Sequence, residues 1–195
     1  KFVLDAASLV QPRGEGEPPF PLRDEFIVED IMHASTVLGR GYEISGDRRF
    51  TDMLADFLAN TGTQQDNGLI WHGRTSKVFW GRGNGFSAMG LSEALSRLPE
   101  DHPGYGLVRD MYERLLHGML PHQEPNGMWR QVTDFPGSYH EFTSTAQTGY
   151  AIARGLRKGW LDASFRPALD LAWQGVSERI QDDGTVVDAC DGTGL

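Results

Sequence analysis

Residues 68–91 read GLIWHGRTSKVFWGRGNGFSAMGL, and they open with a short extended piece that follows a helical stretch and a polar turn. The same arrangement returns twice, because Gly127-Met-Trp129 and Gly184-Thr-Val186 also follow helical stretches and polar turns. The glycines Gly68, Gly127 and Gly184 are spaced by 59 and 57 residues. Each period has room for two helices of about 15 residues and one short extended piece, which predicts an array of helical hairpins.

Upstream of this stretch, apolar residues recur with a helical period from Asp24 onward, without sustained strand alternation. The two apolar stripes are Ile27, Ile31, Ala34 and Leu38, and Phe50, Leu54, Phe57 and Leu58. The expected hairpins span about residues 24–75, 82–134 and 141–190. A hairpin with one apolar face cannot bury that face alone, so such arrays stack into solenoids or close into rings.

The repeat predicts an all-α fold over residues 24–195, in which three hairpins would make half of a six-hairpin ring. We expect residues 1–23, with the Pro- and Gly-rich segment Gln11–Pro21, to be a loop or the remnant of an upstream region. We also expect the chain to be a piece of a longer barrel, truncated at both ends.

Composition narrows the class of protein. The chain has 39% apolar and 23% charged residues, and its 27 acidic and 18 basic residues give a net charge of −9. Without a basic stripe, it is not expected to bind nucleic acid or anionic membranes, and no apolar run approaches the roughly 18 residues of a membrane span. Cys190 is the only cysteine, which excludes an intrachain disulfide. The chain has no signal-peptide pattern, a cytoplasmic and a periplasmic location both fit it, and it predicts no particular oligomeric state.

The connection expected after the first extended piece contains side chains that suit a charged sugar. Aromatic rings cover the apolar face of a pyranose, and arginine binds a carboxylate through two parallel hydrogen bonds. The glycines Gly81, Gly83 and Gly85 are expected to turn the backbone sharply and to bring Arg82 and Asn84 to one side. The candidate substrate-binding residues are His72, Trp80, Arg82, Asn84 and Phe86.

These features also have ordinary structural interpretations. The Gly-Arg-Gly-Asn-Gly run lacks the Lys-Ser/Thr pair and the preceding buried strand of a phosphate loop. Trp80 and Phe86 are equally compatible with core aromatics, and an isolated histidine such as His72 more often has a structural role. A metal site is not predicted, because the chain has no His-x-x-x-His pair and no pair of cysteines.

The stretch Phe79–Phe86 (FWGRGNGF) resembles the Trp-Gly-Arg-Gly-Asn-Gly-Trp signature of glycoside hydrolase family 105, the unsaturated rhamnogalacturonyl hydrolases. Their relatives are the unsaturated glucuronyl hydrolases of family 88. Residues 24–47 resemble the family's helix with Trp-Val-Asp-x-Leu-Phe-Met and its closing Thr-Gly-Asp, and Gly127–Asp134 is similar to its Gly-Leu-Trp-x-Gln-Val-x-Asp. The resemblance extends over about residues 24–195 and implies a six-hairpin α/α barrel. Further similar segments are Ser138–Glu141, Thr143–Ala146 and Asp183–Gly194.

The resemblance implies a hydrolase that removes a terminal unsaturated uronic acid from pectin-like oligosaccharides. Such enzymes hydrate the C4=C5 double bond and give a hemiketal, which rearranges and releases the neighbouring sugar. The reaction needs an acid for the enol-ether carbon and a base for water, and one carboxyl group of raised pKa can serve as both. No cofactor is implied, and the expected partner is the oligosaccharide itself. By motif, His72, Trp80, Arg82 and Phe86 would line the sugar subsite, with Arg82 as the carboxylate anchor.

The acid/base role falls on one of two neighbouring carboxylates. Counting without gaps across residues 24–47 puts Glu29, not Asp30, at the family's catalytic aspartate. Asp30 lies at the edge of the stripe that contains Ile27, whereas Glu29 shares a polar face with His33. Glu29 is therefore the acid if the polar face lines the barrel mouth, and Asp30 is the acid if the apolar face does. Both could also be plain surface carboxylates.

Departures from the family pattern leave competing functions. Glutamate in place of aspartate moves the carboxyl by about one methylene, and a misplacement of about 1 Å can cost around a hundredfold in rate. Phe86 keeps a stacking ring but lacks the indole N–H, and the stretch between His72 and Trp80 is shorter than is usual. A catalytically silent sugar-binding barrel is the alternative function. A structural helical array with a protein partner is the third, and it predicts a large exposed apolar groove.

Overall fold

The computed structural model describes residues 2–10 and 26–192, and most of these residues are helical. Two 3₁₀ turns and two very short strands accompany the helices. The elements are α1 (Phe2–Ser8), α2 (Asp30–Ser45), α3 (Arg49–Ala59), α4 (Gly81–Arg97), α5 (Tyr105–Met119), η1 (Leu120–His122), β1 (Trp129–Arg130), β2 (His140–Glu141), α6 (Phe142–Lys158), η2 (Ala163–Phe165) and α7 (Arg166–Ser177).

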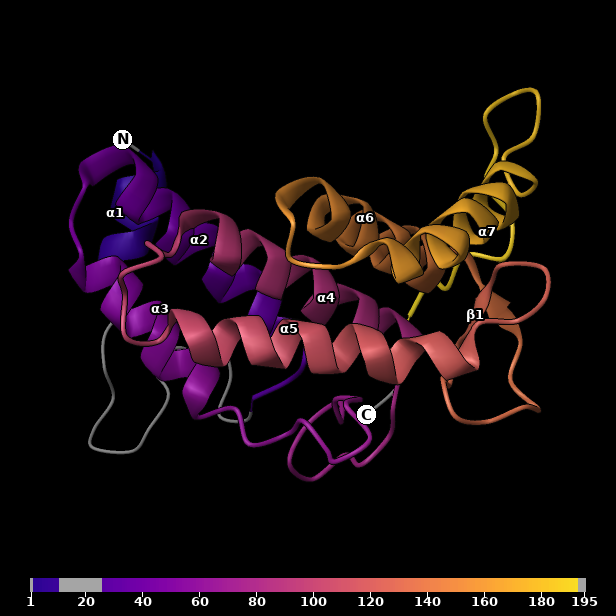
Figure 1. Cartoon of the computed structure of the whole chain (residues 1–195), viewed down its shortest axis with the longest axis horizontal. Helices are drawn as coiled ribbons and strands as arrows, with labels where there is room; N and C mark the ends of the chain where they lie inside the picture. The colour runs from indigo at the N-terminus through magenta and orange to yellow at the C-terminus, as the bar shows by residue number, and fades with distance from the viewer. Residues whose placement is uncertain (1, 11–25, 193–195) are drawn as a thin grey trace.

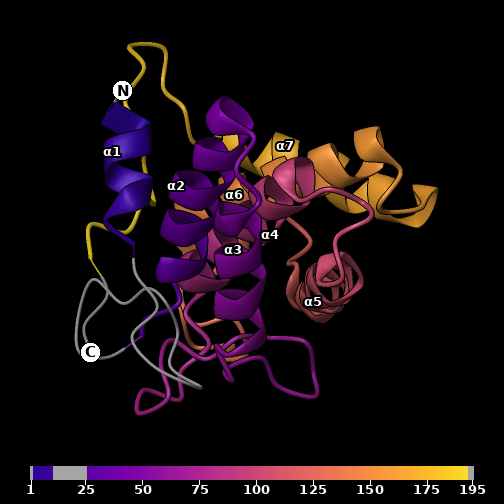
Figure 2. The ribbon, with the colours of Figure 1, turned by 90° about the vertical axis from the view of Figure 1, so that its left-hand side faces the viewer.

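The helices pair as three consecutive hairpins, because α3 packs on α2, α5 on α4 and α7 on α6. The first helices of the hairpins also pack on one another, with α4 lying between α2 and α6 (Figure 1). Figure 2 shows α1 on the opposite side of α2 from α5. The predicted all-α hairpin array is confirmed. None of the described helices is both long and apolar enough to cross a bilayer.

Two sequence predictions differ from the structure, and a third concerns residues that the structure does not describe. Helix α2 begins at Asp30 rather than Asp24, because the Asp30 carboxylate accepts the backbone N–H of Ile27 at 3.1 Å and folds the preceding residues into a turn. Residues 2–8, assigned to a loop or an upstream remnant, form helix α1. The segment Gln11–Pro21 lies outside the described residues.

The repeated glycines occupy equivalent turns, as predicted. Gly68, Gly127 and Gly184 have φ values of 86°, 81° and 84°, a left-handed conformation that glycine adopts without a steric penalty. In each turn the glycine N–H donates to the carbonyl three residues earlier, at 2.8–2.9 Å. The extended pieces near Trp71, Trp129 and Val186 each follow such a turn.

The first two turns, at Gly68 and Gly127, each pack against the second helix of the following hairpin. A Cβ atom at Gly68 would lie 2.1 Å from the carbonyl oxygen of Arg114 in α5, and one at Gly127 would lie 1.9 Å from that of Leu171 in α7. Glycine is therefore required at each of these two positions for two reasons: the left-handed φ, and the close approach of a helix backbone. Glutamine amides reinforce the contacts, with Gln64 Nε2 donating to Met111 O at 2.9 Å and Gln123 Nε2 to Ala168 O at 2.9 Å.

The third turn has the same backbone but no helix packed on it within the described residues. A Cβ atom at Gly184 would meet nothing within 4 Å, and Ile180 is 47% exposed. This turn follows α7 and projects from the helices as the yellow loop of Figure 1. Beside it, an apolar groove of about 290 Å³ runs between α6 and α7, where Trp173 is 71% exposed. The array is thus open at this edge.

Candidate functional site

A cavity of about 410 Å³ lies where α2, α4 and α6 begin. Its wall is built from four separate parts of the chain: the starts of the three helices, and the segment that follows the third turn. The lining residues are Ile27, Glu29, His33, Arg82, Phe86, Thr143 and Cys190. Three of the predicted site residues, Glu29, Arg82 and Phe86, are therefore brought together.

The two candidate acids have different surroundings. Glu29 immediately precedes α2 and lines the cavity, and its side chain is 14% exposed. Asp30 is fully buried, its Oδ2 binds the Ile27 N–H, and its Oδ1 lies 3.7 Å from His33 Nδ1. Glu29 thus stands on the cavity wall, and Asp30 stabilises the turn behind it.

His72 lies next to Glu29. Its Nδ1 is 3.7 Å from Glu29 Oε2, and the ring is almost completely buried. The His72 backbone holds the same region, since its carbonyl accepts the N–H of Val28 at 2.8 Å and its N–H donates to Val78 O at 2.9 Å. His72 is therefore placed to orient the Glu29 carboxylate and the residue before it.

The glycine-rich run is helical, which corrects the prediction that it is a connection. Trp80 is the last extended residue, and α4 begins at Gly81. Arg82 and Phe86 are four residues apart, so they share one face of α4, and both line the cavity. A helix positions these two side chains more rigidly than the expected loop would.

The glycines of this run serve close approach rather than sharp turning. None of Gly81, Gly83 and Gly85 has a positive φ. A Cβ at Gly81 would lie 2.1 Å from Arg130 O, and one at Gly83 would lie 2.5 Å from the Val28 side chain. The start of α4 therefore needs glycine because neighbouring backbone and side chains press against it.

Asn84, which was predicted to bind the sugar, does not line the cavity. Its side chain is fully buried and makes hydrogen bonds to the backbone. Oδ1 accepts the N–H of Ile70 at 2.8 Å, and Nδ2 donates to Ile70 O and Trp80 O, both at 3.0 Å. Asn84 thus attaches the first extended piece to α4 from inside.

Four lining residues, Ile27, His33, Thr143 and Cys190, were not predicted to belong to the site, and Ile27 had been noted only in an apolar stripe. His33 had been noted only as a neighbour of Glu29 on a polar face, and Thr143 only within a family-like segment. Cys190 is 108 residues from Arg82 in the chain, yet its carbonyl lies 3.5 Å from Arg82 Nη1. No local pattern could have indicated that contact.

Several buried polar atoms around the cavity have no hydrogen-bond partner within the described residues. Buried polar groups are nearly always satisfied, so such a cluster marks a surface suited to a polar ligand. The atoms are Glu29 Oε2 and His33 Nδ1, on residues that line the cavity, and His72 Nδ1, beside Glu29. Trp80, which was predicted to line the sugar subsite, does not line the cavity.

In the described part of the chain, no three His, Cys, Asp or Glu side chains converge as a metal site would require. Tyr139 stands beside Cys190, and desolvation together with a hydrogen bond to the Cys190 side chain raises the pKa of Tyr139 to about 12. The phenol is therefore neutral at neutral pH.

Parts of two known proteins are similar to this chain in sequence. A protein of Bacillus subtilis named unsaturated rhamnogalacturonyl hydrolase YesR is 24% identical over 174 residues, which are 85% of this chain and 49% of that protein. An unsaturated 3S-rhamnoglycuronyl hydrolase of Formosa agariphila is 27% identical over 133 residues, covering 63% of this chain and 35% of that protein. The chain thus spans between about a third and a half of these relatives.

Solved structures match the helical array. A possible member of the GH105 family from Salmonella enterica superposes with a TM-score of 0.85 at 20% identity, over 98% of this chain and 55% of that one. The unsaturated glucuronyl hydrolase of Bacillus sp. GL1 superposes with a TM-score of 0.67 at 16% identity, over 91% of this chain and 54% of that one. The fold is therefore about half of a six-hairpin α/α toroid. The sequence pattern of Glycosyl Hydrolase Family 88 matches residues 31–195, and the chain belongs to this family, in its group with family 105.

Proposed function

We propose that the protein containing this chain removes a terminal 4,5-unsaturated uronic acid from pectin-like oligosaccharides, with Glu29 as the acid and base. The observation that carries the proposal is the shared cavity, in which the Glu29 carboxylate lies with the Arg82 guanidinium and the Phe86 ring. An acid, a cation and a stacking surface are what an anionic, unsaturated sugar ring requires. The family binds oligosaccharides, which supports this substrate class.

Each residue has a distinct task in the proposed reaction. Arg82 binds the uronate carboxylate, and Phe86 stacks against the sugar ring. Protonated Glu29 gives its proton to C4, and the resulting cation at C5 is attacked by water. Glu29, now a carboxylate, takes the proton from that water, so that it ends the step protonated again. The C5 hemiketal then opens and releases the neighbouring sugar, and no redox partner is needed.

The direct test follows the ultraviolet absorbance of the C4=C5 double bond in unsaturated disaccharides. The protein as it occurs naturally should consume this absorbance, with rhamnogalacturonan-derived and glucuronyl disaccharides compared side by side. Absence of turnover with both substrates, in a folded sample, would refute the proposed hydrolase.

The competing function is sugar binding without catalysis. It is favoured by one observation, the glutamate at a position where the family has aspartate, which moves the carboxyl by about one methylene. A silent member would bind the unsaturated disaccharide, measured by calorimetry, and leave its absorbance unchanged. Replacing Glu29 by Asp would then restore the family's geometry and create turnover.

A further inference from the structure

Cys190, which forms one wall of the cavity, belongs to residues 187–192, which follow the third turn and return to the start of α6. The contacts are specific. Phe142 N–H donates to Asp188 O at 2.8 Å, and Arg179 Nε lies 3.0 Å from Asp188 Oδ2. Asp188 has φ of 59°, the only positive φ outside glycine among the described residues. A non-glycine residue persists in this conformation only where its surroundings hold it there.

The Glu141 side chain joins residues 187–192 to the start of α6. It is fully buried, and its two oxygens bind three backbone N–H groups. Oε1 accepts from Thr143 and from Cys190, both at 2.9 Å, and Oε2 accepts from Ser144. Two of these donors belong to the first turn of α6 and the third to the cavity wall. A helix cap needs only the first two, so the bond to Cys190 is an additional attachment.

The attached residue faces the proposed uronate anchor. Cys190 and Arg82 both line the cavity, and the Cys190 carbonyl lies 3.5 Å from Arg82 Nη1. The other side of Cys190 is fixed by Gln131, whose Nε2 lies 3.1 Å from Sγ. Moving Cys190 would therefore move an acceptor that limits where the Arg82 guanidinium can lie.

We propose that Glu141 is a positioning residue: it locks residues 187–192 against the start of α6 and thereby fixes the cavity wall beside Arg82. The locking of the wall is a property of this chain alone. Its effect on uronate binding rests on the function proposed above.

Cys190 is the only cysteine of this chain, and it makes the first half measurable in a protein whose cysteines outside these residues, if any, are replaced by serine. The rate at which Cys190 reacts with the thiol reagent DTNB reports how often the wall opens. Glu141→Ala removes both carboxylate oxygens, so the Cys190 N–H loses its acceptor; Glu141→Gln could keep that bond, because Oε1 alone accepts from both Thr143 and Cys190. Losing a hydrogen bond to a charged group should raise the labelling rate roughly tenfold or more. Asp162→Ala is the matched control, because it removes a carboxylate that caps η2 through the Ser164 N–H at 2.8 Å and should leave labelling unchanged.

Steady-state kinetics on an unsaturated disaccharide test the second half. Glu141→Ala should raise KM about tenfold with kcat within about twofold, because a misplaced anchor weakens binding. A merely structural cap would lower the active fraction and leave KM unchanged. Unchanged labelling in folded Glu141→Ala would overturn the lock, and faster labelling with unchanged KM would overturn the positioning role. If the wild-type protein shows no turnover, the proposed function fails, and the labelling comparison still decides whether Glu141 holds the wall.

Discussion

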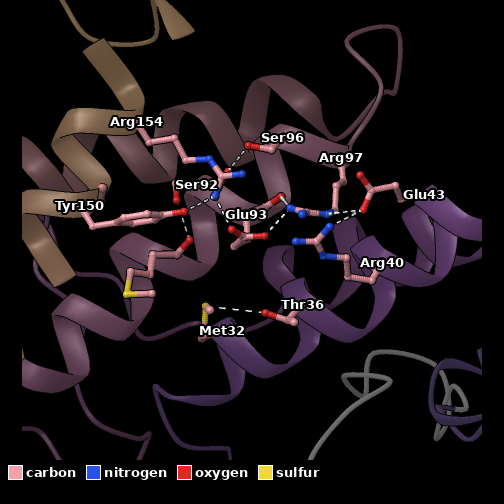
Figure 3. Close-up of polar contacts among 12 residues, drawn as sticks. Met32, Thr36, Arg40, Glu43, Ser92, Glu93, Ser96, Arg97, Tyr150 and Arg154 are labelled. Carbon is pink, nitrogen blue, oxygen red and sulfur yellow. Dashed lines mark hydrogen bonds and ion pairs between the residues drawn. The ribbon is translucent and has the colours of Figure 1, made fainter. Parts of the chain in front are cut away.

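The first and the last turns of the helices α2, α4 and α6 are both rich in polar side chains, but they satisfy them differently. At the first turns, Glu29 before α2 and Trp80 before α4 carry buried polar atoms without hydrogen-bond partners in the described structure, and so does His72 beside Glu29. At the last turns, the Glu93 carboxylate is bound by Arg97 of its own helix and by Arg154 of α6 (Figure 3).

The ion pairs at the last turns join all three helices. Arg97 also lies 3.3 Å from Glu43 of α2, which in turn is 2.7 Å from Arg40. Arg154 further binds the Tyr150 hydroxyl at 2.9 Å. A charge network with nearly every group paired holds helices in register, whereas unsatisfied groups cost stability and persist where a ligand uses them. We therefore call the last turns, with their paired charges, the structural end of the layer, and the first turns, where we propose the substrate site, the functional end.

The largest effect is expected at the functional end. Glu29→Gln removes the proposed acid and base, and general acid–base catalysis contributes about 10²- to 10⁴-fold. We expect kcat to fall by that factor while the melting temperature stays the same or rises, because a neutral amide is cheaper to bury than a carboxylate. Absorbance assays and thermal melts measure the two quantities.

Asp30→Asn is the control for Glu29→Gln. It should lower stability, because Asp30 is buried and binds the Ile27 N–H, and it should affect kcat less. A larger kcat loss in Asp30→Asn than in Glu29→Gln would move the acid/base role to Asp30.

The structural end should respond in the opposite way. Glu93→Ala leaves the Arg154 guanidinium without its carboxylate, and removing one partner of a buried pair costs roughly 3–5 kcal/mol. We expect about 3 kcal/mol in the free energy of unfolding, since Arg97 keeps Glu43. Urea titration measures this change. Asp170→Ala breaks an exposed pair with Arg166 and should cost less than about 1 kcal/mol; equal losses in the two variants would remove the contrast between the ends.

Substitutions of Arg82 test whether its charge alone or also the geometry of its guanidinium is needed at the functional end. Arg82→Lys keeps the positive charge but cannot make the two-pronged contact with a carboxylate. Losing one charge-assisted hydrogen bond should lower kcat/KM about ten- to a hundredfold. Arg82→Ala should lower it further. Wild-type efficiency in both folded variants would make Arg82 structural and deprive the uronate of its anchor.

The sequence predicted the hairpin array because its signal is local and repeated. A left-handed glycine at Gly68, Gly127 and Gly184 is required by the turn itself, so the spacing survives as a pattern. The helical state of Gly81–Gly85 was missed, because glycine has a low helix propensity and only the close approach of Arg130 and Val28 explains it.

The candidate site was only partly predictable, because some of its residues stand in local motifs and others are placed by contacts between distant parts of the chain. Glu29, Arg82 and Phe86 sit in recognisable motifs, and they line the cavity. The choice between Glu29 and Asp30 needed the start of α2, which depends on a hydrogen bond rather than on periodicity. Cys190 reaches the cavity through a contact that joins distant parts of the chain.

The smallest effect is expected at Phe86, where a ring is exchanged for a ring. Phe86→Trp restores the second indole of the family signature, keeps a stacking surface in the cavity and adds an N–H donor. We expect kcat/KM to change by less than about threefold, because stacking contributes only about 0.5–1.5 kcal/mol and is retained. Phe86→Ala should lose up to about tenfold, within the same range of energies. Steady-state kinetics on the two variants measure kcat/KM. A tenfold lower kcat/KM in normally folded Phe86→Trp would mean that the ring packs against the cavity wall rather than the sugar. The functional end would then retain only Glu29 and Arg82 as substrate contacts.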